Sequence, residues 1–295
     1  MFINDMFKNK KAIYSFEIFP PKSDSPINSI YNTLDEMASL SPDFISVTYS
    51  AGGTSPGNLT AGIARDIKNK YNIEPLAHLT CANSEKSELI DVLEKLKGYG
   101  IQNILALRGD IIEGAAHKTD FRYASNLISF IKGKYDFNIV SACYPEGHPE
   151  TSNINQDIKN LKNKADKGAT HLITQLFFNN DDFYNFMYQI REEGITLPVQ
   201  AGIMPVTNKN SIRRIISLCG AAFPKKFVKM LSRYEDNPEA LFDAGIYYAT
   251  EQIIDLLSNN VAGIHLYTMN NPKVARRVTN NIKNILNHIN NDGLW

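Results

Sequence analysis

Residues 13–21 read IYSFEIFPP, an apolar run that contains one carboxylate and ends in two prolines. Its β-branched and aromatic side chains favour a strand, which the prolines would stop. Because side chains alternate along a strand, Ser15, Glu17 and Phe19 share one face. The other face is entirely apolar or aromatic and suits contact with helices, so we expect Glu17 to point away from the helix layer.

Glu17 is the unusual residue of this strand. A lone carboxylate among apolar side chains costs free energy unless it is paired, hydrogen-bonded or protonated. Glu17 is therefore either a structural group with a hidden partner or a working acid. Several later strands also end in polar side chains, and this favours the working acid.

Composition is typical of a globular protein in the cytoplasm. The 295 residues are 43% hydrophobic and 21% charged, and 31 Lys and Arg balance 31 Asp and Glu. Zero net charge disfavours nucleic acid or an anionic membrane as the main partner. No apolar run approaches the roughly 20 residues that span a bilayer, and residues 1–11 are too polar for a signal peptide. Three widely spaced cysteines, Cys81, Cys143 and Cys219, are expected to be free thiols.

Strand and helix patterns alternate along the whole chain. We expect strands over residues 12–19, 44–50, 75–81, 103–109, 137–144, 171–178, 198–204 and 263–269. The clearest helical patterns span residues 84–99, 153–167, 181–193, 208–219, 238–259 and 272–288. About eight such units in a chain of this length predict a (β/α)8 TIM-type barrel forming a single domain over residues 1–295. The rival is an open doubly wound sheet, but the glycine-rich nucleotide loop typical of that fold is absent from the sequence.

Polar side chains gather where the expected strands end, and in a barrel of this type those ends form the site. Arg108 and Asp110 share a face of their strand, and Gln175 lies in an apolar strand where a buried amide needs partners. A shared site is favoured over separate structural roles. The polar residues at the strand ends are Glu17, Thr48, Tyr49, His78, Thr80, Arg108, Asp110, Tyr144, Gln175, His265 and Tyr267.

These residues do not name a reaction by themselves. The first strand lacks the H-x-H pattern of barrel metallohydrolases, and the histidines are widely spaced, so no metal site is expected. No G-x-S-x-G elbow suggests a serine nucleophile. Residues 51–54, AGGT, could bind phosphate through backbone N–H groups or could be a plain loop.

A series of short motifs follows in a specific order along nearly the whole chain: SFEIFPP at 15–21, SVTY at 46–49, HLTC at 78–81, LRGD at 107–110, YPEGHPE at 144–150, ITQ at 173–175 and LYTMN at 266–270. Their order and spacing give the sequence a resemblance to the methylenetetrahydrofolate reductase family. It implies a TIM-type barrel that holds FAD. It also implies ping-pong transfer of a hydride from NADH or NADPH, through FAD, to 5,10-methylenetetrahydrofolate, which supplies methyl groups for methionine synthesis.

The resemblance assigns roles to matching positions. Glu17 would protonate the folate nitrogen, and we expect its apolar strand to raise the pKa of the carboxyl so that it keeps a proton. Asp110 would hold the substrate and tune the flavin, and Gln175 would contact both folate and nicotinamide. Leu231 and Asn271 would be further substrate contacts. The cofactor contacts would be Thr48, Tyr49, Ala51, His78, Arg108, Gly109, Asp110, Tyr123, Ala124, Tyr144, His148, Asp157, Asn160 and Lys164.

Three positions depart from the family pattern. Asn163 stands where an arginine is common near the FAD diphosphate, so Lys164 would carry that contact alone. Leu231 replaces a stacking phenylalanine. Asn271 replaces an arginine that meets the folate tail, for which Lys273 is a candidate substitute. These changes affect expected affinity more than chemistry.

Two alternatives remain open at this point. One is a folate- or flavin-binding barrel without turnover, and the other is a flavin barrel that oxidises an amine such as proline. The sequence does not decide between NADH and NADPH. The resemblance implies a homo-oligomer. Larger family members carry a C-terminal domain that senses S-adenosylmethionine; since only a few residues follow the last expected helix, we expect constitutive activity.

Overall fold

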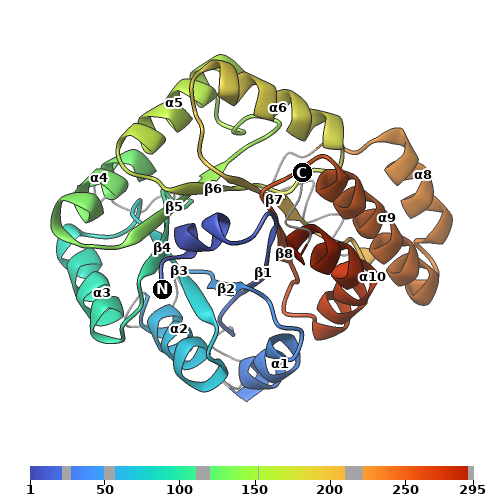
Figure 1. The fold of residues 1–295 in the computed structure, drawn as a ribbon, viewed down its shortest axis with the longest axis horizontal. Coiled ribbons are helices and arrows are strands. Elements are labelled where there is room, and N and C mark those ends of the chain that lie inside the picture. The colour runs from blue at the N-terminus through green and yellow to red at the C-terminus, as the bar shows by residue number, and fades with distance from the viewer. Residues whose placement is uncertain (22–27, 50–56, 111–119, 152, 210–221, 292–295) are drawn as a thin grey trace.

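The structure is a computed structural model that describes residues 1–21, 28–49, 57–110, 120–151, 153–209 and 222–291. Eight parallel strands form a closed barrel in chain order, and β1 pairs with both β2 and β8 (Figure 1). This confirms the expected (β/α)8 barrel and excludes the open sheet. The strands are β1 (Ile13–Ile18), β2 (Phe44–Val47), β3 (Glu74–Thr80), β4 (Asn103–Leu107), β5 (Asn138–Cys143), β6 (His171–Thr174), β7 (Val199–Ile203) and β8 (Gly263–Tyr267).

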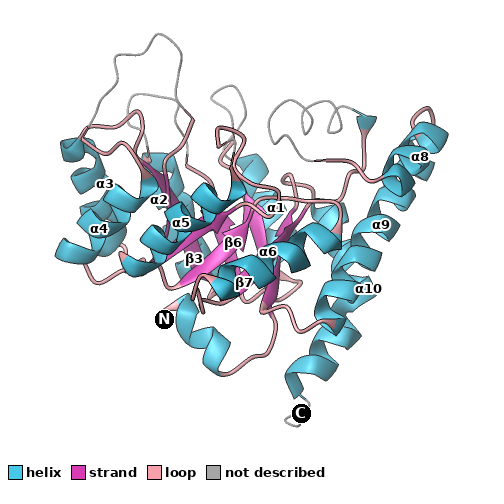
Figure 2. Cartoon of the chain, turned by 90° about the horizontal axis from the view of Figure 1, so that it is seen from above, coloured by secondary structure: helices cyan, strands magenta, loops and turns pink. Residues whose placement is uncertain are grey.

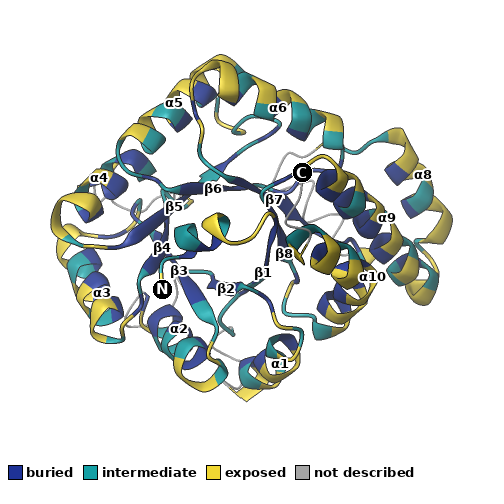
Figure 3. Cartoon of the chain, in the orientation of Figure 1, coloured by how far each residue is buried: buried dark blue, intermediate teal, exposed yellow. Residues whose placement is uncertain are grey.

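Helices surround the barrel and turn their apolar faces to it, while their outer faces are exposed (Figures 1 and 3). α8 lies outside this ring beside α9, as Figure 2 shows. The expected helix at 208–219 lies almost wholly outside the described residues. The helices are α1 (Asn28–Ala38), α2 (Asn58–Tyr71), α3 (Lys86–Gly98), α4 (Ala124–Lys134), α5 (Ile154–Asp166), α6 (Asn180–Glu192), α8 (Lys225–Tyr234), α9 (Pro238–Ser258) and α10 (Pro272–Asn291).

A short 3-10 helix, η1 (Ile3–Lys8), closes the amino-terminal end of the barrel. Ile3 and Met6 are buried against the apolar side chains that fill this end of the barrel interior. The backbone N–H of Ile3 donates to Asn103 Oδ1 at 2.8 Å, and the Met1 amino group meets Glu74 at 2.9 Å. The plug closes this end of the barrel, so a ligand site is expected at the carboxyl ends of the strands.

α9 approaches the chain beyond β7 so closely that only glycine fits at one position. A Cβ atom on Gly245 would lie 2.0 Å from the carbonyl oxygen of Val206. This contact sets how α9 packs against the barrel. None of the helices within the described ranges is both long and apolar enough to cross a bilayer.

His171 is a fully buried titratable group at the plugged end of the barrel. Its ring lies 5.1 Å from that of Phe7, and neither ring nitrogen has a hydrogen-bond partner among the described residues. Burial lowers the pKa of His171 to about 3, so the folded protein keeps the ring neutral. An unfolded histidine takes up a proton near pH 6.5. Stability therefore falls as the pH drops below that value.

We predict that the free energy of unfolding of His171→Leu depends less on pH below 6.5 than that of the wild type. The free energy of unfolding of the wild type should lose up to about 1.4 kcal/mol per pH unit on account of this one group below pH 6.5. Urea unfolding at pH 7.0, 6.0 and 5.0 measures the slope. The variant should show a shallower slope than the wild type. Equal slopes in His171→Leu and wild type would contradict the prediction.

Candidate active site

A cavity of about 550 Å³ opens at the carboxyl ends of the strands. Glu17 lies at the end of β1 and lines this cavity, as its strand face predicted. Residues from seven strands or their exits converge here, so the structure brings the expected polar strand ends together, except His265, which is buried and does not line the cavity. The lining comprises Glu17, Thr48, Tyr49, His78, Thr80, Asn83, Leu105, Leu107, Arg108, Gly109, Asp110, Ala142, Tyr144, His148, Ile173, Thr174, Gln175 and Tyr267.

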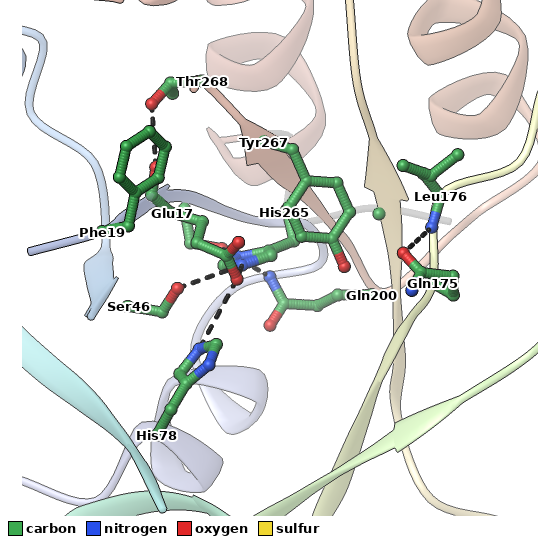
Figure 4. Close-up of polar contacts among 12 residues, drawn as sticks. Glu17, Phe19, Ser46, His78, Gln175, Leu176, Gln200, His265, Tyr267 and Thr268 are labelled. Carbon is green, nitrogen blue, oxygen red and sulfur yellow. Dashed lines mark hydrogen bonds and ion pairs between the residues drawn. The ribbon is translucent and has the colours of Figure 1, made fainter. Parts of the chain in front are cut away.

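Two imidazoles flank the Glu17 carboxylate (Figure 4). Oε2 of Glu17 lies 3.5 Å from Nε2 of His78 and 3.6 Å from Nε2 of His265. Both histidines are buried, while the Glu17 side chain is 20% exposed to the cavity. Glu17 thus has buried partners on one side and is open to the cavity on the other. A structural role and a role as a working acid are both compatible with this position.

His265 is held by hydroxyl groups of two neighbouring strands. Its Nδ1 lies 2.7 Å from Ser15 Oγ, and its Nε2 lies 3.2 Å from Ser46 Oγ. The amide nitrogen of Gln200 donates to Ser15 Oγ at 3.1 Å. These contacts hold the ring so that Nε2 faces Glu17. The order Gln200, Ser15, His265, Glu17 forms a buried polar chain that ends at the cavity.

The pKa of Glu17 differs from the sequence-based expectation. Burial raises it, as expected, but the hydrogen bond from His265, the charges of the two histidines and a hydrogen bond from Ser46 together hold the pKa below its ordinary value. Burial lowers the pKa of His78 to about 4, so this ring is neutral near pH 7. The expectation of a raised pKa is wrong for this structure, because it treated the strand as apolar and missed the inward polar groups of its neighbours.

The exits of β1 and β8 are tied together next to Glu17. Thr268 Oγ1 donates to the Glu17 carbonyl oxygen at 2.8 Å. The Asn270 amide accepts from Phe19 N–H at 3.0 Å and donates to the Phe19 carbonyl oxygen at 2.8 Å. Asn270 has a positive φ of 54°, a conformation that asparagine tolerates better than most residues. This clamp fixes the backbone that carries Glu17.

Tyr267 forms one wall of the cavity. Its hydroxyl donates to the Thr174 carbonyl oxygen at 2.7 Å, and its ring packs edge-on to His265. A Cβ atom on Gly202 would lie 2.7 Å from the Tyr267 ring and 2.3 Å from the Thr174 carbonyl oxygen. Glycine at position 202 therefore makes room for this wall. Next to it, Gln175 Oε1 accepts from Leu176 N–H at 2.9 Å, which orients its amide.

A second cavity of about 560 Å³ extends the first outward between β4, β5 and the helices α4 and α5. The two cavities share Arg108, Tyr144 and His148 in their linings, so together they form one elongated depression. The second cavity brings together most of the remaining expected cofactor contacts. These are Arg108, Tyr123, Ala124, Tyr144, His148, Asp157, Asn160 and Lys164, with Asn163 beside them.

Two cations and two carboxylates line the second cavity within the described part of the chain. Lys164 donates to the Ala142 carbonyl oxygen at 2.6 Å, and burial lowers its pKa. Arg108 forms a two-point ion pair with Glu150, with Nη–Oε distances of 2.6 and 2.7 Å. Asp157 accepts from the backbone N–H of His148 at 3.1 Å. The cavity thus offers positive charge that is partly compensated by its own carboxylates.

Some expected site residues lie elsewhere. Leu231 is buried in a separate apolar cluster with Phe178 and Phe227 and lines neither cavity. The Asn271 side chain accepts from Lys273 N–H at 3.0 Å at the start of α10, where it acts as a helix cap. Ala51 and the 51–54 loop lie outside the described residues. Their ligand contacts stay predictions, and the structure does not bring Leu231 or Asn271 to the cavity walls.

Sequence reasoning missed the groups that support Glu17. Ser46 pairs in register with Glu17, and Ser15 pairs with His265, so strand alternation combined with strand order would have placed them together. Gln200 gave no local signal, since its partner is 185 positions away in the chain. Cys81 and Cys143 are buried free thiols, and Cys219 lies outside the described residues. The described residues contain no cluster of three or more potential metal ligands.

A barrel whose strand ends hold a carboxylate between imidazoles, next to a cation-lined extension, has the architecture of an enzyme of the (β/α)8 class. The profile of the methylenetetrahydrofolate reductase family matches residues 2–283. The chain is 33% identical to 5,10-methylenetetrahydrofolate reductase of Escherichia coli over 261 residues, covering 88% of this chain and 87% of that protein. The chain therefore belongs to the methylenetetrahydrofolate reductase family, as the motifs suggested.

Longer relatives and solved structures extend the comparison. A probable methylenetetrahydrofolate reductase (NADH) of Oryza sativa is 35% identical over 295 residues, covering 95% of this chain, but the chain spans only 50% of its length. A Clostridium thermocellum protein, described as binding two copies of 5-methyl-5,6,7,8-tetrahydrofolic acid, is 13% identical. It has a TM-score of 0.65 and covers 97% of this chain and 99% of its own, and at this identity it shows the shared fold alone.

We predict that His265→Leu raises the pKa of Glu17. The variant removes a hydrogen bond and a neighbouring charge that favour the ionised carboxylate, while burial continues to disfavour it. The pH dependence of the Glu17 side-chain carboxyl ¹³C shift, assigned with Glu17→Gln, measures this. We expect the midpoint of this titration to move to higher pH. His171→Leu, at the other end of the barrel, serves as the control and should leave the titration in place; an unchanged midpoint in His265→Leu would contradict the assignment.

Proposed function

We propose that this protein reduces 5,10-methylenetetrahydrofolate to 5-methyltetrahydrofolate, using FAD and either NADH or NADPH. The observation that carries the proposal is the position of Glu17, a carboxylate with one side open to a cavity that Asp110 and Gln175 also line. Membership of the methylenetetrahydrofolate reductase family supports this reaction class. Relatives from rice, Arabidopsis thaliana and Zea mays are named as NADH enzymes, which supports NADH as the donor.

Glu17 would act as the acid that protonates the folate nitrogen when the five-membered ring opens. An acid must carry a proton at that moment, yet the neighbours of Glu17 keep its pKa low. A folate ring over the exposed fifth of the side chain would remove water from the carboxylate and raise its pKa. His265 would keep Glu17 oriented and share a hydrogen with it through Nε2. Substrate binding would thus turn an ionised carboxylate into a proton donor.

Three other residues would position the substrate and the nicotinamide. The amide oxygen of Gln175 is engaged by Leu176 N–H, so the amide nitrogen is left to donate to a ligand carbonyl. Asp110 is exposed at the rim of the cavity, where its carboxylate can accept from the N–H groups of a pterin ring. Thr48 adds a hydroxyl at the exit of β2. These donors and acceptors suit a flat heterocycle with polar edges.

The two joined cavities fit FAD, a long cofactor with a flat ring system at one end and an adenosine at the other. Ser141 Oγ is fully buried, faces the second cavity and has no hydrogen-bond partner among the described residues, which suits a polar ligand group there. Arg108 and Lys164 would hold the diphosphate, and Tyr144 with His148 would line the junction between the two halves. When bound, FAD supplies the hydride relay between the nicotinamide and the folate.

We predict that the protein binds FAD without a glycine-rich Rossmann loop. Purified protein should be yellow, or should become so on reconstitution, with one FAD per chain. Lys164→Gln should weaken FAD binding roughly tenfold, because one charge-assisted hydrogen bond to phosphate contributes about 1.5 kcal/mol. Lys162→Gln, on the same helix but outside the cavity lining, is the matched control. Fluorescence titration measures both, and a protein that takes up no FAD would refute the proposal.

We predict that Glu17→Gln separates the two half-reactions. The variant cannot protonate the folate nitrogen, so reoxidation of the reduced flavin by methylenetetrahydrofolate should slow by a factor of about 100 or more. Reduction of FAD by NADH needs no such proton and should change little. Anaerobic stopped-flow absorbance follows each step, with Glu192→Gln on the outer face of α6 as control. Equal losses in both half-reactions would show that Glu17 has a different role.

A further inference from the structure

The fork formed by the two Nη atoms of Arg108 is occupied by a carboxylate of the same chain. Nη1 and Nη2 of Arg108 both donate to Glu150, and its Nε donates to the Gly109 carbonyl oxygen at 3.2 Å. A bidentate arginine–carboxylate pair uses the same planar fork that recognises phosphate. A phosphate group that binds this Nη1/Nη2 fork must therefore take the place that the Glu150 carboxylate now fills.

The Glu150 side chain can rotate away from Arg108 without moving the cavity wall. Its side chain is 58% exposed, so water can receive the carboxylate, whereas Arg108 is 21% exposed and stays in the wall. The backbone before it is held independently: Glu150 N–H donates to His148 Nδ1 at 3.2 Å, and His148 N–H donates to Asp157 at 3.1 Å. Rotation of the Glu150 side chain breaks the ion pair and none of these backbone contacts.

We propose that Glu150 is an internal anion that occupies the phosphate-binding fork of Arg108 and is displaced when the diphosphate of the dinucleotide cofactor binds. This inference rests on the proposed function, since it takes FAD as the ligand of the second cavity. Glu150 thereby sets the affinity for FAD: it neutralises Arg108 in the cofactor-free protein and competes with the cofactor for the same two donors.

The charge balance of the second cavity favours departure of Glu150 when a diphosphate binds. Arg108 and Lys164 are opposed by Glu150 and Asp157, so the described lining carries no net positive charge while all four are in place. A diphosphate that entered without displacing Glu150 would meet a carboxylate at the site of its own contact, and like charges there repel. Departure of Glu150 removes this repulsion and exposes the cationic fork.

The test compares FAD and riboflavin binding to Glu150→Gln and to the wild type. The glutamine keeps the size of the side chain but removes its charge, so it is a weaker competitor for Arg108. FAD should bind at least fivefold more tightly to the variant, measured by quenching of flavin fluorescence at fixed ionic strength. Riboflavin lacks the diphosphate, and its affinity should change less than twofold. The control is Glu146→Gln, a carboxylate of the same segment that accepts from Ala222 N–H instead, and it should leave both affinities unchanged.

A double-mutant cycle separates exchange at Arg108 from general repulsion. In the Arg108→Gln background there is no fork to compete for, so adding Glu150→Gln should change FAD affinity less than twofold. A full fivefold gain in that background would mean that Glu150 acts only as a distant charge, and the exchange would be refuted. Weaker FAD binding by Glu150→Gln alone would show that Glu150 positions Arg108 for the cofactor, which also refutes it.

Failure of the proposed function gives a different result. If the wild type and every variant bind no FAD, the cofactor assignment is wrong, and so is the proposed displacement of Glu150 by the diphosphate. If the wild type binds FAD and Glu150→Gln binds it no more tightly, the exchange alone is wrong and the cofactor assignment stands.

Discussion

The contact between the Glu17 carboxylate and the imidazole of His265 organises the functional end of this barrel. A carboxylate inside a barrel is stable only if other strands supply partners, and here β2, β3, β7 and β8 contribute to the support. The free-energy cost of burying this carboxylate is offset by the polar chain that runs from Gln200 through Ser15 and His265 to Glu17 at the cavity. The apolar filling and the η1 plug are placed at the opposite end, where no ligand needs access.

The site divides its tasks along one elongated depression. The inner cavity is lined by Glu17, the oriented amide of Gln175 and the ring of Tyr267, while two cations and two carboxylates among the described residues line the outer cavity. Under the proposed function, proton transfer would take place at Glu17, which lies between buried histidines, and the diphosphate would bind beside the exposed Glu150. Cofactor affinity would then be set at the rim without altering the proposed acid.

The sequence was sufficient for the barrel and for the end of the barrel at which the polar side chains gather, because strand alternation and strand ends are local patterns. It was insufficient for the state of Glu17, whose pKa depends on residues that only strand pairing brings together. Leu231 and Asn271 were assigned from motif position, yet one packs in an apolar cluster and the other caps a helix. The η1 plug was also missed, since its few apolar residues form no helical pattern and are buried only because they pack against the closed barrel.

The most direct test of the account is a single turnover with wild-type protein. The protein is loaded with FAD, reduced anaerobically with one equivalent of NADH and mixed with 5,10-methylenetetrahydrofolate. The account predicts that flavin absorbance returns and that one equivalent of 5-methyltetrahydrofolate forms per flavin, identified by mass spectrometry. Reduced flavin that persists in the presence of the folate, with no methyl product, would contradict it.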